Sequence, residues 1–212
     1  MRFVDIHTHG NQSDADAIRI FNLIPGEKLP ESFFSVGIHP WYANKYTIDQ
    51  VEEIIKAHPD KCVAIGECGL DLLRSPLGPF EQEELFRAHL ELARKYNKPV
   101  ILHMVRAAHV FGRIIKDFSD LTFIWHGFNA KPDVFHQLKN RNVYYSFGPS
   151  VKSEYVWEHI DVEKILCETD DSNENIETVY QNLASIRNLN EENLKKQIFA
   201  NAIKVFGDGL ER

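Results

Sequence analysis

Short apolar runs alternate with longer stretches of helical periodicity along almost the whole chain of 212 residues. The apolar runs are nearly continuous, which is typical of strands buried on both faces of a parallel sheet. In the stretch 80–97, Phe86, Leu90 and Ala93 recur at the spacing of one helix face. Strands that alternate with helices form a parallel sheet covered by helices. The sequence therefore predicts an α/β fold, and seven such strands indicate a TIM-like (β/α) barrel.

Local signals support the helix boundaries, because Pro132 fits the first turn of a helix and Gly207 fits a helix C-terminal cap. The expected strands cover residues 2–7, 33–38, 62–67, 99–104, 121–126, 142–147 and 164–168. The expected helices cover roughly residues 48–58, 80–97, 107–117, 132–140, 153–160, 174–187 and 191–206.

The segment 10–32 is too short for the regular start of a barrel. It holds 23 residues, whereas two parallel crossovers of about a dozen residues each, with a strand between them, need more. The run AIRIFNL (17–23) could be a strand, but PGEKLP after it is too short for a helix. We therefore expect truncated first βα units and a distorted or incomplete barrel within a single domain of residues 1–212. Residues 17–23 would be either an antiparallel hairpin arm or an irregular barrel strand.

Composition excludes several classes of protein. The net charge is −7 and no basic run is present, which argues against a dedicated duplex-DNA binder. No apolar run approaches the ~18 residues of a membrane span, and no signal-peptide pattern opens the chain, so we expect no membrane partner. Cys62, Cys68 and Cys167 lie in apolar runs without a CxxC motif, which favours a reducing cytoplasm over a disulfide framework or a thiolate zinc site. No obligate protein partner is indicated.

Potential metal ligands end six of the expected strands. His7 and His9 in VDIHTHG are two positions apart, so their imidazoles point to the same side of a strand. The carboxyl ends of parallel barrel strands open onto one face, where active sites lie. A lone histidine after an apolar run is most often structural, but six coincidences at equivalent positions favour a metal site. The candidates are His7, His9, His39, Glu67, Asp71, His103, His126, Glu168 and Asp170.

Imidazoles and carboxylates without thiolates suit Zn²⁺, Mn²⁺, Co²⁺ or Fe²⁺, and Mg²⁺ is compatible with them. The number of ligands exceeds one tetrahedral site. Two divalent ions ~3.5–4 Å apart, bridged by one carboxylate and one hydroxide, would use the set fully. Glu67 is the expected bridge, because it comes from the middle of the strand order.

Many motifs of this chain resemble the TatD-type deoxyribonuclease family in order, from residue 3 to about residue 207. They are VDIHTHG, SVGIHPWY, AIGECGLDL, Gln82 and Phe86 in EQEELFRAHLELA, KPVILH, WHGFNA, YYSFGPSV, LCETD and NAIKVFG. The resemblance implies a metal-dependent phosphodiester hydrolase of the amidohydrolase-like superfamily. It further implies that His7, His9, Glu67 and Asp170 bind the first metal, that Glu67, His103 and His126 bind the second, and that His39 faces the substrate.

The regions that would shape the substrate site depart from the family pattern. Trp41 replaces a second histidine after GIHP, and Arg106 is displaced by one position from the usual arginine, which Val105 replaces. The motif HGFNA replaces an HCFSG-like motif, and DSNENIETV replaces a proline-rich loop after ETD. We expect Arg106 to bind phosphate, because the guanidinium fork matches it. Trp41 and Tyr42 either stack on a base or pack as a loop-anchoring pair.

The leading hypothesis is a two-metal nuclease that trims single-stranded or frayed DNA ends, with another small phosphodiester as the alternative substrate. Asp170 would ligate the first metal and orient or deprotonate the attacking water, while Glu168 and Asp71 would support metal ligands. An amide, lactone or ester hydrolase of the same superfamily is a second hypothesis. Such enzymes often bridge their metals with a carboxylated lysine, and no lysine ends a strand here. A non-catalytic metal-binding protein is the third, and the intact ligand set argues against it.

Overall fold

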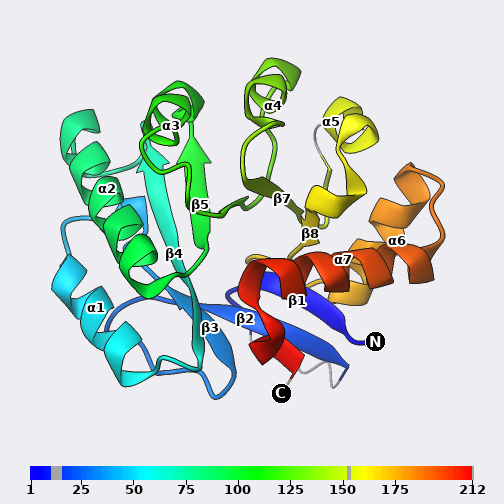
Figure 1. Ribbon diagram of the computed structural model, residues 1–212, viewed down its shortest axis with the longest axis horizontal. Helices are drawn as coiled ribbons and strands as arrows, with labels where there is room; N and C mark the ends of the chain where they lie inside the picture. Colours follow the sequence, from blue (N-terminus) through cyan, green and yellow to red (C-terminus); the bar gives the residue numbers. More distant parts are fainter. Residues whose placement is uncertain (11–15, 152–153, 212) are drawn as a thin grey trace. The chain divides into compact units, whose positions relative to one another are not determined.

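The computed structural model describes residues 1–10, 16–151 and 154–211 (Figure 1). Its strands form one sheet in the order of the sequence, from β1 to β8. Every pairing with a defined register is parallel, which confirms the predicted α/β class. The strands are β1 (Phe3–Thr8), β2 (Ala17–Leu23), β3 (Phe33–Val36), β4 (Cys62–Asp71), β5 (Val100–Val105), β6 (Phe123–Trp125), β7 (Val143–Phe147) and β8 (Ile165–Cys167).

Helices follow the strands as the sequence predicts, with boundaries that differ by a few residues. The α-helices are α1 (Ile48–Ala57), α2 (Pro79–Tyr96), α3 (Ala108–Ile114), α4 (Pro132–Leu138), α5 (Glu154–His159), α6 (Ile176–Ile186) and α7 (Glu191–Phe206). Short 3-10 helices cover Pro40–Tyr42, Val162–Lys164 and Asp208–Glu211. In the described residues, no helix combines the length and apolar character needed to cross a membrane.

The chain divides into two compact units, one of residues 1–21 with 126–212 and the other of residues 22–125. In the first unit, α6 and α7 pack against β1, and β1 lies beside β8 through a parallel bridge of Thr8 with Asp170. In the second, α1 packs on β3 and α2 on β4. The single domain over residues 1–212 stays a prediction.

Residues 17–23 form a parallel barrel strand. β2 pairs with β1 from Phe3 opposite Ala17 to Thr8 opposite Phe21, with a register shift between Asp5 and Thr8. The described residues between β1 and β3 contain no helix. The expected truncation and the irregular strand are therefore confirmed, and the antiparallel hairpin alternative is wrong.

β4 is longer than predicted, and the bounds of β4 and β5 correct the position of two site residues. After a register shift between Ile65 and Cys68, β4 continues to pair with β5 up to Asp71 opposite Val105. Gly66 and Gly69 have positive φ angles of 137° and 146°, and a Cβ at either residue would collide with a carbonyl oxygen of β5. Glycine thus lets the two backbones approach here. Glu67 and His103 lie inside strands rather than at the expected strand ends.

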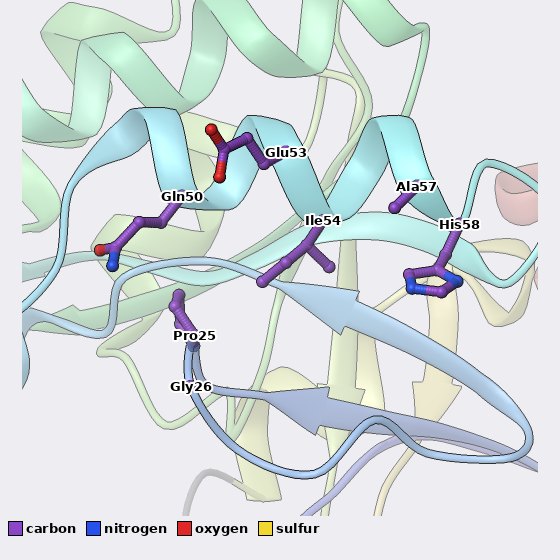
Figure 2. Close-up of a pocket in the computed structure, with 7 residues that line it drawn as sticks. All are labelled: Pro25, Gly26, Gln50, Glu53, Ile54, Ala57 and His58. Carbon is purple, nitrogen blue, oxygen red and sulfur yellow. The ribbon is translucent and has the colours of Figure 1, made fainter.

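A groove of about 360 Å³ lies between α1 and the loop after β2 in the second unit, and Figure 2 shows Ile54 pointing from α1 toward that loop. Its lining residues are Pro25, Gly26, Gln50, Glu53, Ile54, Ala57 and His58. No candidate site residue is among them, so this groove is separate from the predicted chemistry.

Candidate metal-binding clusters

His7, His9 and Asp170 form a cluster in the unit that contains β1 and β8. Oδ1 of Asp170 lies 3.5 Å from Nε2 of His7 and 3.6 Å from Nε2 of His9. The backbone fixes this arrangement, because Asp170 donates its N–H to the carbonyl of His7 and accepts the N–H of His9. Asp170 has a φ of 54°, which turns the chain at this point. The predicted pair of histidines and the predicted carboxylate are therefore together.

A buried hydrogen-bond network lies next to this cluster, and the sequence did not predict it. Thr169 donates its N–H and its hydroxyl to the Asp5 carboxylate over 3.0 and 2.6 Å. The same hydroxyl lies 2.9 Å from the hydroxyl of Thr8. Burial raises the pKa of Asp5 to about 6, although the hydrogen bonds from Thr169 work in the opposite direction. An aspartate inside the apolar run FVDI was the available signal in the sequence.

His126 follows β6 and belongs to the same unit as His7. Its ring centroid lies 4.6 Å from that of His7. Oε1 of the buried Glu168 lies 3.4 Å from Nδ1 of His126 and accepts the N–H of Gly127 over 2.5 Å. Glu168 therefore lies next to the His126 ring, and its role in orienting that ring stays a prediction.

His39, Glu67 and His103 form a second cluster, in the unit of residues 22–125. Nδ1 of His103 lies 2.6 Å from Oε1 of Glu67 and 3.1 Å from Nε2 of His39. Nε2 of His39 is 3.4 Å from the same Glu67 oxygen. Asn22 accepts the backbone N–H of Glu67 over 2.8 Å and so ties this part of β4 to β2. His39, which the resemblance places on the substrate side, lies here among ligand-type atoms.

Asp71 connects this second cluster to the loop that follows β4. Its Oδ2 accepts the indole N–H of Trp41 over 2.6 Å and lies 3.4 Å from Nε2 of His103. Its Oδ1 accepts the backbone N–H groups of Leu73 and Arg74. Burial works to raise the pKa of Asp71, but the hydrogen bonds, led by that from Trp41, outweigh it and lower the pKa. Asp71 is therefore an ionised acceptor at neutral pH.

Arg106 and Trp41 are the other predicted substrate contacts. Arg106 directly follows β5, is exposed, and has a φ of 55°. Trp41 lies in the 3-10 helix after His39, with its ring edge-on to the His39 ring at 4.8 Å. The Arg74 guanidinium lies 4.9 Å from the Trp41 ring centroid. Both predicted contacts are accessible, since Trp41 keeps an exposed fraction of 38%.

The donor atoms of both clusters fit divalent metal ions. Each cluster offers two imidazole nitrogens and one carboxylate oxygen, all within 4.8 Å of one another. Nitrogen and oxygen donors without thiolate suit Zn²⁺ and Mn²⁺, and the carboxylates are compatible with Mg²⁺. The three cysteines are buried as free thiols and belong to neither cluster. The predicted metal chemistry thus has suitable residues in each unit.

The sequential parallel sheet and the histidine–carboxylate clusters define a metal-dependent hydrolase of the (β/α)-barrel class. The chain belongs to the family described as TatD related DNase, whose profile matches residues 11–207. A solved structure of YJJV, a TatD homologue from Escherichia coli, has a TM-score of 0.79 and 20% identity and covers 97% of this chain and 98% of that one. This likeness confirms the TIM-like barrel fold.

Curated relatives agree with this family. A putative deoxyribonuclease TATDN1 homologue from Enterocytozoon bieneusi is 33% identical over 157 residues, which cover 68% of this chain and 57% of the relative. The 3'-5' ssDNA/RNA exonuclease TatD from Yersinia pseudotuberculosis is 36% identical over 115 residues, covering 53% of this chain and 41% of that protein. The chain therefore matches about half the length of these relatives.

Proposed function

We propose that this protein is a metal-dependent phosphodiesterase that trims single-stranded or frayed DNA ends. The observation that best supports this proposal is the close approach of His7, His9 and Asp170. In the family's fold, the possible ligand atoms of these three residues lie within 4.8 Å of one another. Relatives named as a deoxyribonuclease and as single-strand exonucleases support the phosphodiester as the substrate class. The net charge of −7 disfavours a grip on long duplex DNA and favours a strand end.

When bound, divalent ions polarise a phosphoryl oxygen and lower the pKa of water toward ~7. The chain's own residues then position the reactants. Asp170, held between His7 and His9, orients the attacking water and takes up its proton. His39 and Arg106 hold the non-bridging oxygens of the phosphodiester, and the planar fork of Arg106 fits two of them. Glu168 keeps His126 in a fixed orientation.

The proposal includes two divalent ions per chain, Zn²⁺, Mn²⁺ or Mg²⁺, and Glu67 would be one of their ligands. Its support is the ligand assignment implied by the family resemblance, together with the donor set of each cluster. Elemental analysis of protein loaded with Zn²⁺ or Mn²⁺ tests this stoichiometry. We expect up to two ions in the wild type and a lower count in Glu67→Gln. Anomalous scattering that finds no ion beside His7 and His9 contradicts the proposal.

A substrate screen tests the reaction itself. Metal-loaded protein is assayed with a bis-aryl phosphodiester, an aryl ester, an N-acyl amino acid and end-labelled single-stranded DNA. We expect hydrolysis of the phosphodiester and shortening of the DNA from one end, both absent from an Asp170→Asn preparation purified in parallel. Cleavage of esters or amides alone would be consistent with the proposed metal chemistry but would refute the proposed nuclease activity. Loss of all activity despite bound metal would favour a non-catalytic metal-binding protein.

We also propose a cytoplasmic location. Its support is the three buried thiols, Cys62, Cys68 and Cys167, since burial raises the pKa of each and keeps it protonated. Fractionation of cells that express the full chain tests the location. Recovery outside the cytoplasm would contradict it.

A further inference from the structure

The guanidinium of Arg74 covers one face of an exposed tryptophan in the unit of residues 22–125. Its central carbon lies 4.9 Å from the ring centroid of Trp41, within the range of a cation–π contact. Arg74 comes from the loop that follows β4, and Trp41 from the 3-10 helix after His39. Two loops that are far apart in sequence therefore present one stacked pair.

Hydrogen bonds hold this pair in a fixed position. Asp71 accepts the indole N–H of Trp41 on one carboxylate oxygen and the backbone N–H of Arg74 on the other, over 2.6 and 3.0 Å. Gln82 on α2 accepts the backbone N–H of Asp71 over 2.9 Å. A single buried carboxylate thus fixes both the tryptophan ring and the start of the arginine loop. The indole and the backbone of the arginine loop are thus ordered before a ligand binds, which reduces the entropy that binding costs.

The stacked pair lies beside the cluster of His39, Glu67 and His103. The Trp41 ring is edge-on to the His39 ring at 4.8 Å and to the His103 ring at 5.9 Å. The Asp71 oxygen that accepts the indole N–H is also 3.4 Å from Nε2 of His103. An anion bound by Arg74 would therefore be a close neighbour of a group bound at this cluster.

No carboxylate among the described residues pairs with the Arg74 guanidinium, although the chain pairs other arginines with acids. In the same unit, Arg87 contacts Asp117, Arg94 contacts Asp120 and Arg113 contacts Glu83. Arg74 instead lies over an aromatic ring, 4.9 Å from its centroid, and its guanidinium carries five N–H donors. Such a stacked guanidinium is suited to bidentate recognition of phosphate.

We infer that Arg74, stacked on Trp41, is an anion subsite that binds a second phosphate of the substrate strand. The inference rests on the proposed phosphodiesterase function and adds to it a contact with a phosphate other than the one that is cleaved. Substrates with two or more phosphates, such as short oligonucleotides, gain an interaction that a simple phosphodiester lacks. Trp41 serves the strand through the arginine that it holds rather than by stacking a base on the covered face.

Kinetics on two substrates test the subsite in the metal-loaded full chain. The probes are the single-stranded trinucleotide dTdTdT, which has two phosphates, and a bis-aryl phosphodiester, which has one. We expect Arg74→Ala to reduce the ratio of the two kcat/KM values by ten-fold or more, mainly through the KM for the trinucleotide. Arg74→Lys should recover only part of this loss, because lysine keeps the charge without the planar fork. An unchanged ratio overturns the inference.

Arg113→Ala is the matched control, since it removes one positive charge from the same unit at an exposed site paired with Glu83. The ratio of the two kcat/KM values should be the same in Arg113→Ala as in the wild type. A drop in Arg113→Ala as large as that in Arg74→Ala would mean that net charge, rather than a subsite, carries the effect, and would overturn the inference.

Direct binding separates the subsite from the chemistry. Fluorescence anisotropy of a labelled phosphorothioate trinucleotide measures Kd without turnover, and we expect Arg74→Ala to weaken it about ten-fold while Arg113→Ala does not. Cleavage by wild type with equal Kd values for both variants overturns the inference and leaves the proposed function standing. Binding that depends on Arg74 without any cleavage refutes the proposed function and supports the subsite. Absence of binding by the wild type overturns both.

Discussion

The buried imidazole of His89 accepts the backbone N–H of Ile38 over 2.9 Å. Its other nitrogen, Nδ1, lies 2.8 Å from the carbonyl oxygen of Leu85, one helical turn earlier in α2. Nε2 must therefore be unprotonated and Nδ1 must carry the proton, so the ring is neutral. Through this contact, α2 holds the residue that precedes His39. His89 positions a cluster residue without belonging to the cluster.

The His89 contact predicts a specific pH dependence of stability. Burial lowers the pKa of His89 to about 4, from an ordinary value of 6.5. Between these values the unfolded chain binds a proton that the folded chain excludes, so stability rises with pH. The contribution is complete above pH ~6.5 and is lost as the pH falls toward ~4. We expect about 2 kcal/mol of it to disappear between pH 7.5 and 5.

Urea unfolding in the presence of a chelator measures this loss in the wild type and in His89→Gln. Glutamine at position 89 can still accept a hydrogen bond, but it has no proton to gain in this pH range. The unfolding free energy of His89→Gln should therefore depend less on pH. The substitution should also lower this free energy at pH 7.5. Identical pH dependence in the two proteins would show that His89 does not carry the effect.

Asp170→Asn should abolish turnover of a phosphodiester. Its carboxylate lies within 3.6 Å of both His7 and His9, and the amide can neither take up a proton nor supply the same negative charge to an ion. Loss of a positioned general base costs about 10²–10⁴ in rate. Single-turnover rates with a bis-aryl phosphodiester check this, with Asp60→Asn at an exposed position as the control. Retention of wild-type turnover would remove Asp170 from the mechanism.

Glu168→Gln should keep a substantial part of the activity. Glu168 receives the Gly127 N–H on Oε1, and a glutamine carbonyl can accept the same hydrogen bond. Its effect on His126 is one of orientation, which glutamine partly preserves, so the loss should stay below the roughly 10-fold that removal of such a partner costs. Comparison of kcat in the Asp170 and Glu168 variants checks the assignment. Should Glu168→Gln be the more severe of the two, the roles given to these carboxylates are reversed.

The sequence predicted the strand–helix alternation because hydrophobic periodicity is a local property of each segment. It also predicted that His7, His9 and Asp170 meet, since the first two lie at the end of one strand and the third follows the strand beside it. The direction of residues 17–23 stayed open, because pairing with β1 depends on contacts outside the segment. The extent of β4 was wrong because Gly66 and Gly69 are typical of turns. Only the neighbouring β5 backbone explains them as strand residues.

The supporting residues were the least accessible to sequence reasoning. His89 fits the buried face of α2, so its bond to Ile38 could not be distinguished from ordinary packing. The pairing of Trp41 with Arg74 depends on two loops separated by β4, and no spacing rule relates them. Residue type indicates what a side chain can do, whereas the partner that it meets is set by the topology.

Asp71→Asn should weaken zinc binding at the site that includes Glu67 and His103. Asp71 is ionised and lies 3.4 Å from Nε2 of His103. The other nitrogen of that ring, Nδ1, faces Glu67. A neutral amide supports the ring less well, and loss of such a partner typically costs about 10- to 100-fold in metal affinity. Competition with a chromophoric chelator measures the affinity, with Asp60→Asn as the control and the unfolding midpoint as a check on folding. Unchanged affinity in a folded Asp71→Asn would show that Asp71 serves only Trp41 and the loop of Arg74.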